Sequence, residues 1–163
     1  MKALTVWQPW ASLIMAGAKP FEFRKWSFLE RANTRALLNT RIVIHAGTRA
    51  IKPSEVEDIL ERLDTGGTSL KPKIARPILE RLRAAYQCRG VLELGAGLGT
   101  AVLGKPRRIK GPFSTPDSDR VDQHLFAWSL TDIKPFDAPV HCRGFQGFWQ
   151  WPFEPTKQER KTP

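Results

Sequence analysis

The order of apolar segments along the chain limits the available folds more than any other feature. Strand-like segments occupy residues 3–7, 21–24 and 41–46, and two segments with helical spacing lie within 53–88. Strand character returns from residue 90, with further predicted strands at 91–94, 98–103, 125–130 and 140–142. A doubly wound α/β fold needs strands and helices in regular alternation, which this order lacks. The sequence therefore predicts the α+β class, with a small, partly closed β-barrel of mixed or antiparallel strands and flanking helices.

Length and composition predict one domain. The chain has 163 residues, of which 41% are hydrophobic, and this is enough apolar material for one core. We expect a single domain over residues 1–152, with a helical insertion or variable region at 53–88. Residues 153–163 are rich in proline and charge, and we expect them to form a flexible C-terminal tail.

The apolar runs and the cysteines predict the cellular compartment of the protein. No run approaches the ~18 residues of a membrane helix, so we expect no membrane partner. Two cysteines, Cys88 and Cys142, cannot form a disulfide scaffold, and this favours a reducing cytoplasm. The cysteines and the histidines His124 and His141 show no metal-ligand spacing, so we predict no metal and no cofactor.

Positive charge is concentrated near the N-terminus. The formal net charge is +10, and residues 1–50 hold eight Lys or Arg against two acidic residues, a net of +6. A second basic cluster lies at 105–110. Such an excess favours a polyanionic partner, although a solvated basic surface would look the same.

The segment 17–24, GAKPFEFR, fits the pattern G-x-K-x-x-E-x-R. Residues 21–24 alternate aromatic and charged side chains, which predicts a half-buried strand whose phenylalanines face the core. Glu22 and Arg24 would then share the other face. Glu22 can accept hydrogen bonds from Lys19 or Arg24 and hold either in place, and a guanidinium can bind phosphate or stack on a base.

This segment resembles the signature of the ASCH domain, a relative of the PUA fold. The resemblance extends to residues 4–11, 41–47, 98–103, 126–132 and 144–149, which together span most of residues 3–152. The last two segments resemble the closing strands of the domain. It implies a small PUA-like barrel with a cleft beside the signature. It also implies binding of RNA or single nucleic-acid bases, while some members are amidohydrolases acting on acylated cytidine and others are reported as ribonucleases.

We therefore expect a basic cleft that binds RNA or another single-stranded nucleic acid, or a modified nucleobase, nucleoside or nucleotide. The alternative is a hydrolase in the same cleft, either a nucleoside amidohydrolase or a ribonuclease, with Lys19 as base and Glu22 assisting. The amidohydrolase-like members carry a threonine where this chain has Glu22, which removes their candidate nucleophile. The candidate ligand-binding residues are Lys19, Glu22, Arg24, Trp7, Gln8, Trp10 and His45.

A third, less favoured hypothesis comes from the segment 91–100, VLELGAGLGT. It is similar to the first motif of a methyltransferase that uses S-adenosylmethionine, in which glycines let the backbone approach the ligand. That motif should open a helix, but Lys105 and Pro106 follow closely, and only 63 residues remain after Thr100 for further βα units. We expect instead a glycine-bearing strand that bends around a small barrel.

Overall fold

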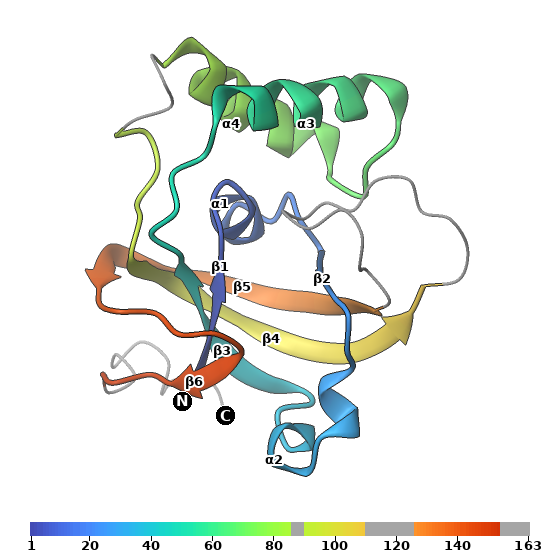
Figure 1. Ribbon diagram of the computed structural model, residues 1–163, viewed down its shortest axis with the longest axis vertical. Coiled ribbons are helices and arrows are strands. Elements are labelled where there is room, and N and C mark those ends of the chain that lie inside the picture. Colours follow the sequence, from blue (N-terminus) through green and yellow to red (C-terminus); the bar gives the residue numbers. More distant parts are fainter. Residues whose placement is uncertain (86–89, 110–125, 154–163) are drawn as a thin grey trace.

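The computed structural model describes residues 1–85, 90–109 and 126–153. A mixed sheet lies beside a pair of longer helices (Figure 1). In chain order, the elements are β1 (Lys2–Val6), α1 (Trp10–Met15), β2 (Phe21–Arg24), the 3₁₀ helix η1 (Phe28–Glu30), α2 (Ala32–Arg35), β3 (Thr40–Ala46), α3 (Pro53–Thr65), α4 (Pro72–Ala84), β4 (Ala96–Arg108), β5 (Phe126–His141) and β6 (Phe148–Gln150).

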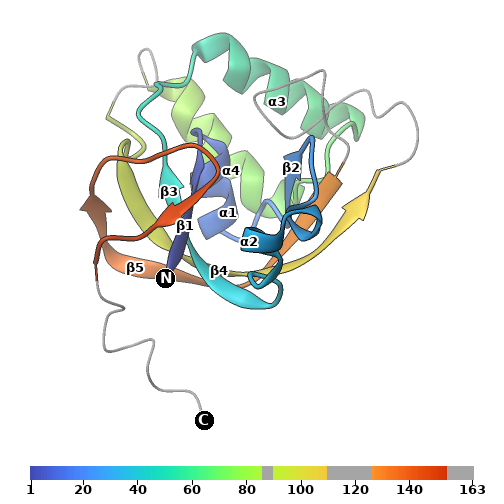
Figure 2. The same cartoon turned by 60° about the horizontal axis from the view of Figure 1, so that its bottom comes forward.

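The strands form one sheet in the order β2-β5-β4-β3-β1-β6. β1 runs parallel to β3, and the other neighbouring pairs are antiparallel. The sheet curves around α1, and α3 and α4 lie over its open side (Figures 1 and 2). The fold class predicted from the sequence, α+β with a partly closed barrel of mixed strands and flanking helices, is therefore confirmed.

Glycines in β4 let other parts of the chain approach this strand closely. A Cβ atom on Gly97 would lie 2.3 Å from the ring of Trp151, and one on Gly99 would lie 2.5 Å from the carbonyl oxygen of Lys134. These contacts are too short for any side chain, so the glycines serve packing in a bent strand. The register of β4 with β5 also shifts between Gly97 and Gly99, as expected where a sheet bends.

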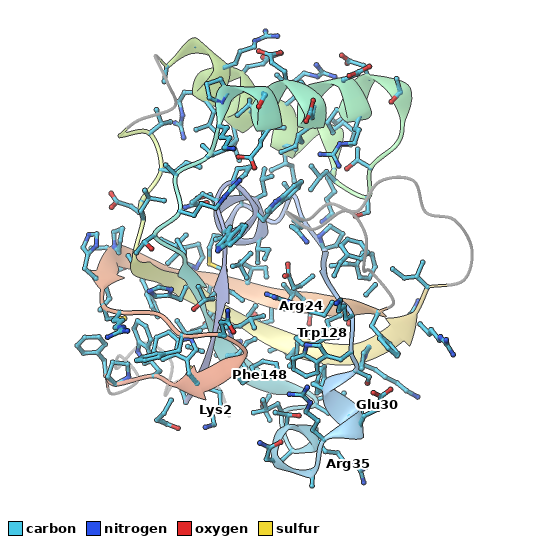
Figure 3. All side chains as sticks on the ribbon, in the orientation of Figure 1. Lys2, Arg24, Glu30, Arg35, Trp128 and Phe148 are labelled. Carbon is cyan, nitrogen blue, oxygen red and sulfur yellow. The ribbon has the colours of Figure 1, made fainter. Side chains whose placement is uncertain are left out.

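Aromatic residues join the two edges of the sheet. Phe148 of β6 stacks on Trp128 of β5 with a centroid distance of 5.5 Å and also meets Trp26, just after β2, edge-on at 6.2 Å. Figure 3 labels Phe148, Trp128 and Arg24 in the same region of the view. Trp128 is fully buried, and its Nε1 donates to the carbonyl of Trp26 at 3.2 Å. The edge strands β2 and β6 are thereby held near each other.

Two strand predictions were wrong in detail. Residues 91–94 are not a strand, because β4 begins only at Ala96, after Gly95 adopts a left-handed φ of 62°. The segments 125–130 and 140–142 were expected as separate strands, but the single strand β5 spans Phe126–His141. Residues 131–139 obscured this continuity, because none of them is buried and they show no apolar alternation.

The helical region 53–88 contributes to the main core. α3 and α4 bury apolar residues such as Ile59 and Leu79 in the same cluster as Leu13 and Ile14 of α1. Whether the region is an insertion stays a prediction. Residues 86–89, and residues 154–163 of the tail expected over 153–163, lie outside the described residues. Within the described ranges, no helix has the length and apolar character needed to cross a membrane.

Candidate nucleobase-binding cleft

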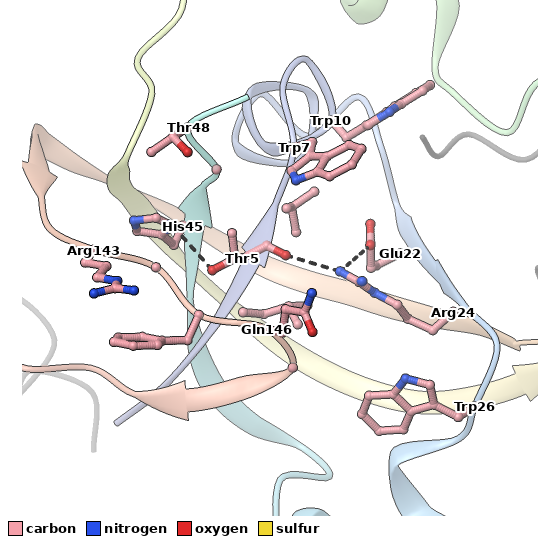
Figure 4. A pocket seen from close by; sticks show the side chains of 16 residues that line it. Thr5, Trp7, Trp10, Glu22, Arg24, Trp26, His45, Thr48, Arg143 and Gln146 are labelled. Atoms are coloured by element: carbon pink, nitrogen blue, oxygen red, sulfur yellow. Dashed lines mark hydrogen bonds and ion pairs between the residues drawn. The ribbon is translucent and has the colours of Figure 1, made fainter. Parts of the chain in front are cut away.

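A pocket of about 560 Å³ lies between β1, β2 and the connection from β5 to β6 (Figure 4). Its volume falls within the ~300–1,000 Å³ typical of small-molecule sites. The described residues that line it are Leu4, Thr5, Val6, Trp7, Trp10, Glu22, Arg24, Trp26, His45, Gly47, Thr48, Arg143, Gly144, Phe145, Gln146 and Gly147.

Glu22 is the buried residue of β2. It is 4% exposed, whereas Phe21 and Phe23 are only half-buried, so the expectation that the phenylalanines face the core was wrong. The inward face of β2 instead presents Glu22 and Arg24 to the pocket. A carboxylate is tolerated there because each of its oxygens has a cation: Oε2 lies 3.2 Å from Lys19 Nζ, and Oε1 lies 2.9 Å from Arg24 Nη2.

Lys19 lies behind Glu22 and is not one of the described residues that line the pocket. It is 1% exposed, and its ammonium donates to the carbonyl of Phe21 as well as to Glu22. The ring of Phe23 lies 4.9 Å from the ammonium. Gly17 places Lys19 here by ending α1 with a left-handed φ of 72°. Lys19 thus holds the Glu22 carboxylate and neutralises its charge.

Arg24 reaches across the pocket toward β1. Its Nη2 donates to the carbonyl oxygen of Thr5 at 3.2 Å and also pairs with Glu22, so two acceptors on different strands fix one edge of the guanidinium (Figure 4). Its Nε is buried and has no partner within the described part of the chain. A buried unpaired donor is uncommon in native proteins, and it marks Arg24 as a group with unused hydrogen-bonding capacity.

Two tryptophans on opposite sides of Arg24 line the pocket (Figure 4). Each contacts an arginine that does not line the pocket itself. The guanidinium of Arg49 lies 4.6 Å from the ring of Trp7, and that of Arg31 lies 4.5 Å from the ring of Trp26. Arg49 also pairs with Glu55 in the first turn of α3, which links the Trp7 wall to the helical region. Trp10 lines the pocket too but is 5% exposed, so most of it belongs to the core.

His45 is fully buried at the end of β3 and takes part in a chain of hydrogen bonds. Trp149 Nε1 donates to Thr5 Oγ1 at 3.1 Å, Thr5 Oγ1 lies 3.4 Å from His45 Nδ1, and His45 Nε2 lies 3.0 Å from the carbonyl oxygen of Cys142. A proton on Nε2 satisfies the carbonyl and leaves Nδ1 to accept from Thr5. Burial lowers the pKa of His45, opposed by the carbonyls of Cys142 and Gly95. The ring is therefore a neutral part of the pocket wall.

Gln8 is the remaining candidate ligand-binding residue, and it is not one of the described residues that line the pocket. It is 1% exposed, its Nε2 donates to the carbonyl of Glu93 at 2.8 Å, and its Oε1 accepts from the backbone N–H of Ser12 at 3.1 Å. Gln8 thus ties α1 to the segment before β4. Both ends of its amide are occupied by the backbone.

The connection 142–147 was missed as part of the site. Its residues Arg143, Phe145 and Gln146 line the pocket. The resemblance to the ASCH domain implied a closing strand over 144–149, whereas β6 covers only Phe148–Gln150. The available signal was the pair of glycines, Gly144 and Gly147. Gly147 has a φ of 69°, and a Cβ on Gly144 would lie 2.5 Å from His45 Cε1, so both positions require glycine for a tight loop.

The methyltransferase hypothesis lacks its structural context. Gly97 and Gly99 lie inside β4, which is antiparallel to both of its neighbours, and no helix follows this strand within the described residues. Asp117, which lies at a plausible distance in sequence for a ribose contact, falls outside the described residues. Nor do three or more His, Cys, Asp or Glu side chains gather into a metal-binding group anywhere in the described ranges.

Comparisons with known proteins gave a structural neighbour. No family model and no curated protein matched the chain. Among solved structures, the chain is similar to ASCH from Zymomonas mobilis, with 16% sequence identity and a TM-score of 0.43. The similarity covers 86% of this chain and 72% of that one. This neighbour carries the name of the ASCH domain. Segment 17–24 resembles the signature of that same domain.

Proposed function

We propose that the cleft binds a nucleobase, either within single-stranded RNA or as a modified nucleoside or nucleotide. The observation that carries the proposal is the placement of Arg24. Its guanidinium is fixed by Thr5 and Glu22 inside a concave pocket whose walls include Trp7 and Trp26. Flat aromatic walls favour flat ligands, and a guanidinium donates to the carbonyl oxygens of a base or to phosphate.

Charge supports an electron-rich or anionic ligand. Among the described lining residues are two guanidinium groups, on Arg24 and Arg143, and one carboxylate, on Glu22. Lys19 already neutralises that carboxylate from behind. The cleft thus has a net positive character, and Glu22 contributes by orienting Arg24.

The hydrolase alternative has no comparable support. A general base must reach the proton that it removes, but Lys19 Nζ donates to Phe21 and Glu22 behind the pocket wall. Glu22 does line the pocket, yet both of its oxygens are engaged by cations. We therefore favour binding without turnover, and intact RNA should be recovered after prolonged incubation with the protein.

Calorimetric titration with short single-stranded RNAs and with natural and acylated nucleosides tests the proposal. Arg24→Gln should weaken binding of a hit by about 10- to 150-fold, as expected for loss of a charged hydrogen bond of ~1.5–3 kcal/mol. Arg83→Gln is the matched control, because it removes the same charge from the exposed end of α4. Arg143→Gln, an exposed substitution, guards against a folding defect in the first variant.

The proposal fails if none of these ligands binds. It also fails if the Arg24 and Arg143 variants bind as tightly as the Arg83 control.

A further inference from the structure

Phe145 is exposed at the lip of the pocket. It lines the pocket, yet 53% of its surface is accessible, which makes it one of three exposed large hydrophobic residues in the described part of the chain. The glycines Gly144 and Gly147 on either side force the chain into the tight loop that carries it. The loop thus presents an aromatic ring to solvent beside a polar cleft, where packing of the core does not require one.

The Phe145 ring is supported along one side. It meets Trp149 at a centroid distance of 5.5 Å and an interplanar angle of 63°. Trp149 is itself 8% exposed and fixed by its hydrogen bond to Thr5 Oγ1. A ring held by its neighbour while half of its surface stays open is suited to stacking, because little conformational freedom is lost when a second ring lies on it.

A cation accompanies the ring. The guanidinium of Arg143 lies 5.6 Å from the centroid of Phe145, and both residues belong to the same loop at the pocket lip. In Figure 4, Arg143 lies at the His45 side of the pocket, away from Arg24 and Trp26. The pocket therefore has an inner cation, Arg24, and an outer cation with its own aromatic surface.

We propose that Phe145 and Arg143 form an outer subsite for the neighbouring nucleotide of a single-stranded nucleic acid whose one base occupies the pocket. Phe145 stacks on the next base, and Arg143 contacts the phosphate that joins the two nucleotides. Alternating aromatic and cationic groups are how proteins follow a single strand. This inference rests on the proposed function, and it specifies the ligand as an oligonucleotide.

Two probes separate the subsites. One is an 8-nucleotide single-stranded RNA of mixed sequence labelled with fluorescein and followed by anisotropy. The other is the set of four ribonucleoside 5′-monophosphates measured by calorimetry. Phe145→Ala should weaken RNA binding by about 5- to 150-fold, the range for loss of one stacked base. It should weaken mononucleotide binding by a clearly smaller factor, because Phe145 lies at the lip of the pocket. Phe145→Trp should restore RNA binding, because it keeps a stacking surface.

Phe153→Ala is the matched control. Phe153 is a similarly exposed aromatic residue, 45% accessible, that packs on Trp151 and is not one of the described lining residues. Its removal should leave both affinities unchanged.

The outcomes distinguish the two proposals. Suppose that Arg24→Gln weakens the binding of both probes. If Phe145→Ala then weakens the binding of neither probe, or of both equally, the outer subsite is refuted while the proposed binding in the pocket is supported. If RNA binds no more tightly than the mononucleotides, the outer subsite is refuted as well. If neither probe binds, the outer subsite is refuted. If Arg24→Gln changes neither affinity, the proposed function fails and the outer subsite with it.

Discussion

The ion pair between Lys19 and Glu22 should make Glu22→Gln far more damaging than a typical charge substitution. The Lys19 side chain is 0% exposed and that of Glu22 is 5% exposed, so water cannot replace the missing carboxylate charge. Loss of one partner from a buried pair costs about 3–5 kcal/mol. With a urea m value of about 2 kcal/mol/M, the midpoint of unfolding should fall by about 1.5–2.5 M. Glutamine keeps the shape of the side chain, so the change isolates the charge.

Urea unfolding followed by tryptophan fluorescence measures this shift. Asp64→Asn is the control, because it makes the same acid-to-amide change in an exposed pair with Arg76 and should cost less than about 1 kcal/mol. The double variant Lys19→Met with Glu22→Gln should recover much of the loss, since it leaves no buried ammonium without a partner. A Glu22→Gln variant within 1 kcal/mol of the parent, or a double variant no more stable than the single one, would refute this reasoning.

Three further predictions concern the pocket walls and the bend of the sheet. Burial lowers the pKa of His45 from 6.5, so on acidification the unfolded state binds a proton at a higher pH than the folded state does. The free energy of unfolding should therefore fall as pH drops through about 6.5. His45→Gln should flatten that part of a profile of urea midpoint against pH. Gly97→Ala, whose Cβ would lie 2.3 Å from Trp151, should lower the melting temperature by about 2–12 °C in calorimetry. Arg49→Ala removes the cation from one face of Trp7 and should weaken nucleotide binding about 2- to 10-fold in titrations, while unfolding changes by less than about 1 kcal/mol. An unchanged pH profile, melting temperature or affinity, respectively, would contradict each.

Local patterns in the sequence were sufficient to predict most elements of the fold. The apolar spacing of residues 53–63 and the β-branched run 41–46 each produced the expected element. The long strand β5 was split in two because its exposed residues interrupt the apolar pattern. A strand with many exposed residues shows only weak apolar periodicity in its sequence. The full length of β5 is defined by its pairing with β4, which a single sequence does not reveal.

The site was predictable along β2 and not at the loop. The spacing of Lys19, Glu22 and Arg24 placed them together, because three residues around one strand end must be near each other. The alternation of aromatic and charged residues divides β2 into two faces, but it does not determine which of the two faces is buried. A carboxylate faces inward here because two cations accompany it. Arg143 and Phe145 are about 120 residues away in the chain, and only the folded sheet brings them to the same pocket.

The pocket depends on the curvature of the whole sheet, because the charged side chains among its described lining residues come from opposite edges. Glu22 and Arg24 lie on β2, at one edge, and the loop 142–147 leads into β6, at the other. A flat six-stranded sheet would separate these edges by about 24 Å, at about 4.8 Å between neighbouring strands. The glycines of β4 permit the bend, and the contact of Phe148 with Trp26 holds the edges together. A change at Gly97 should therefore reduce ligand affinity as well as stability, although Gly97 is not one of the described lining residues.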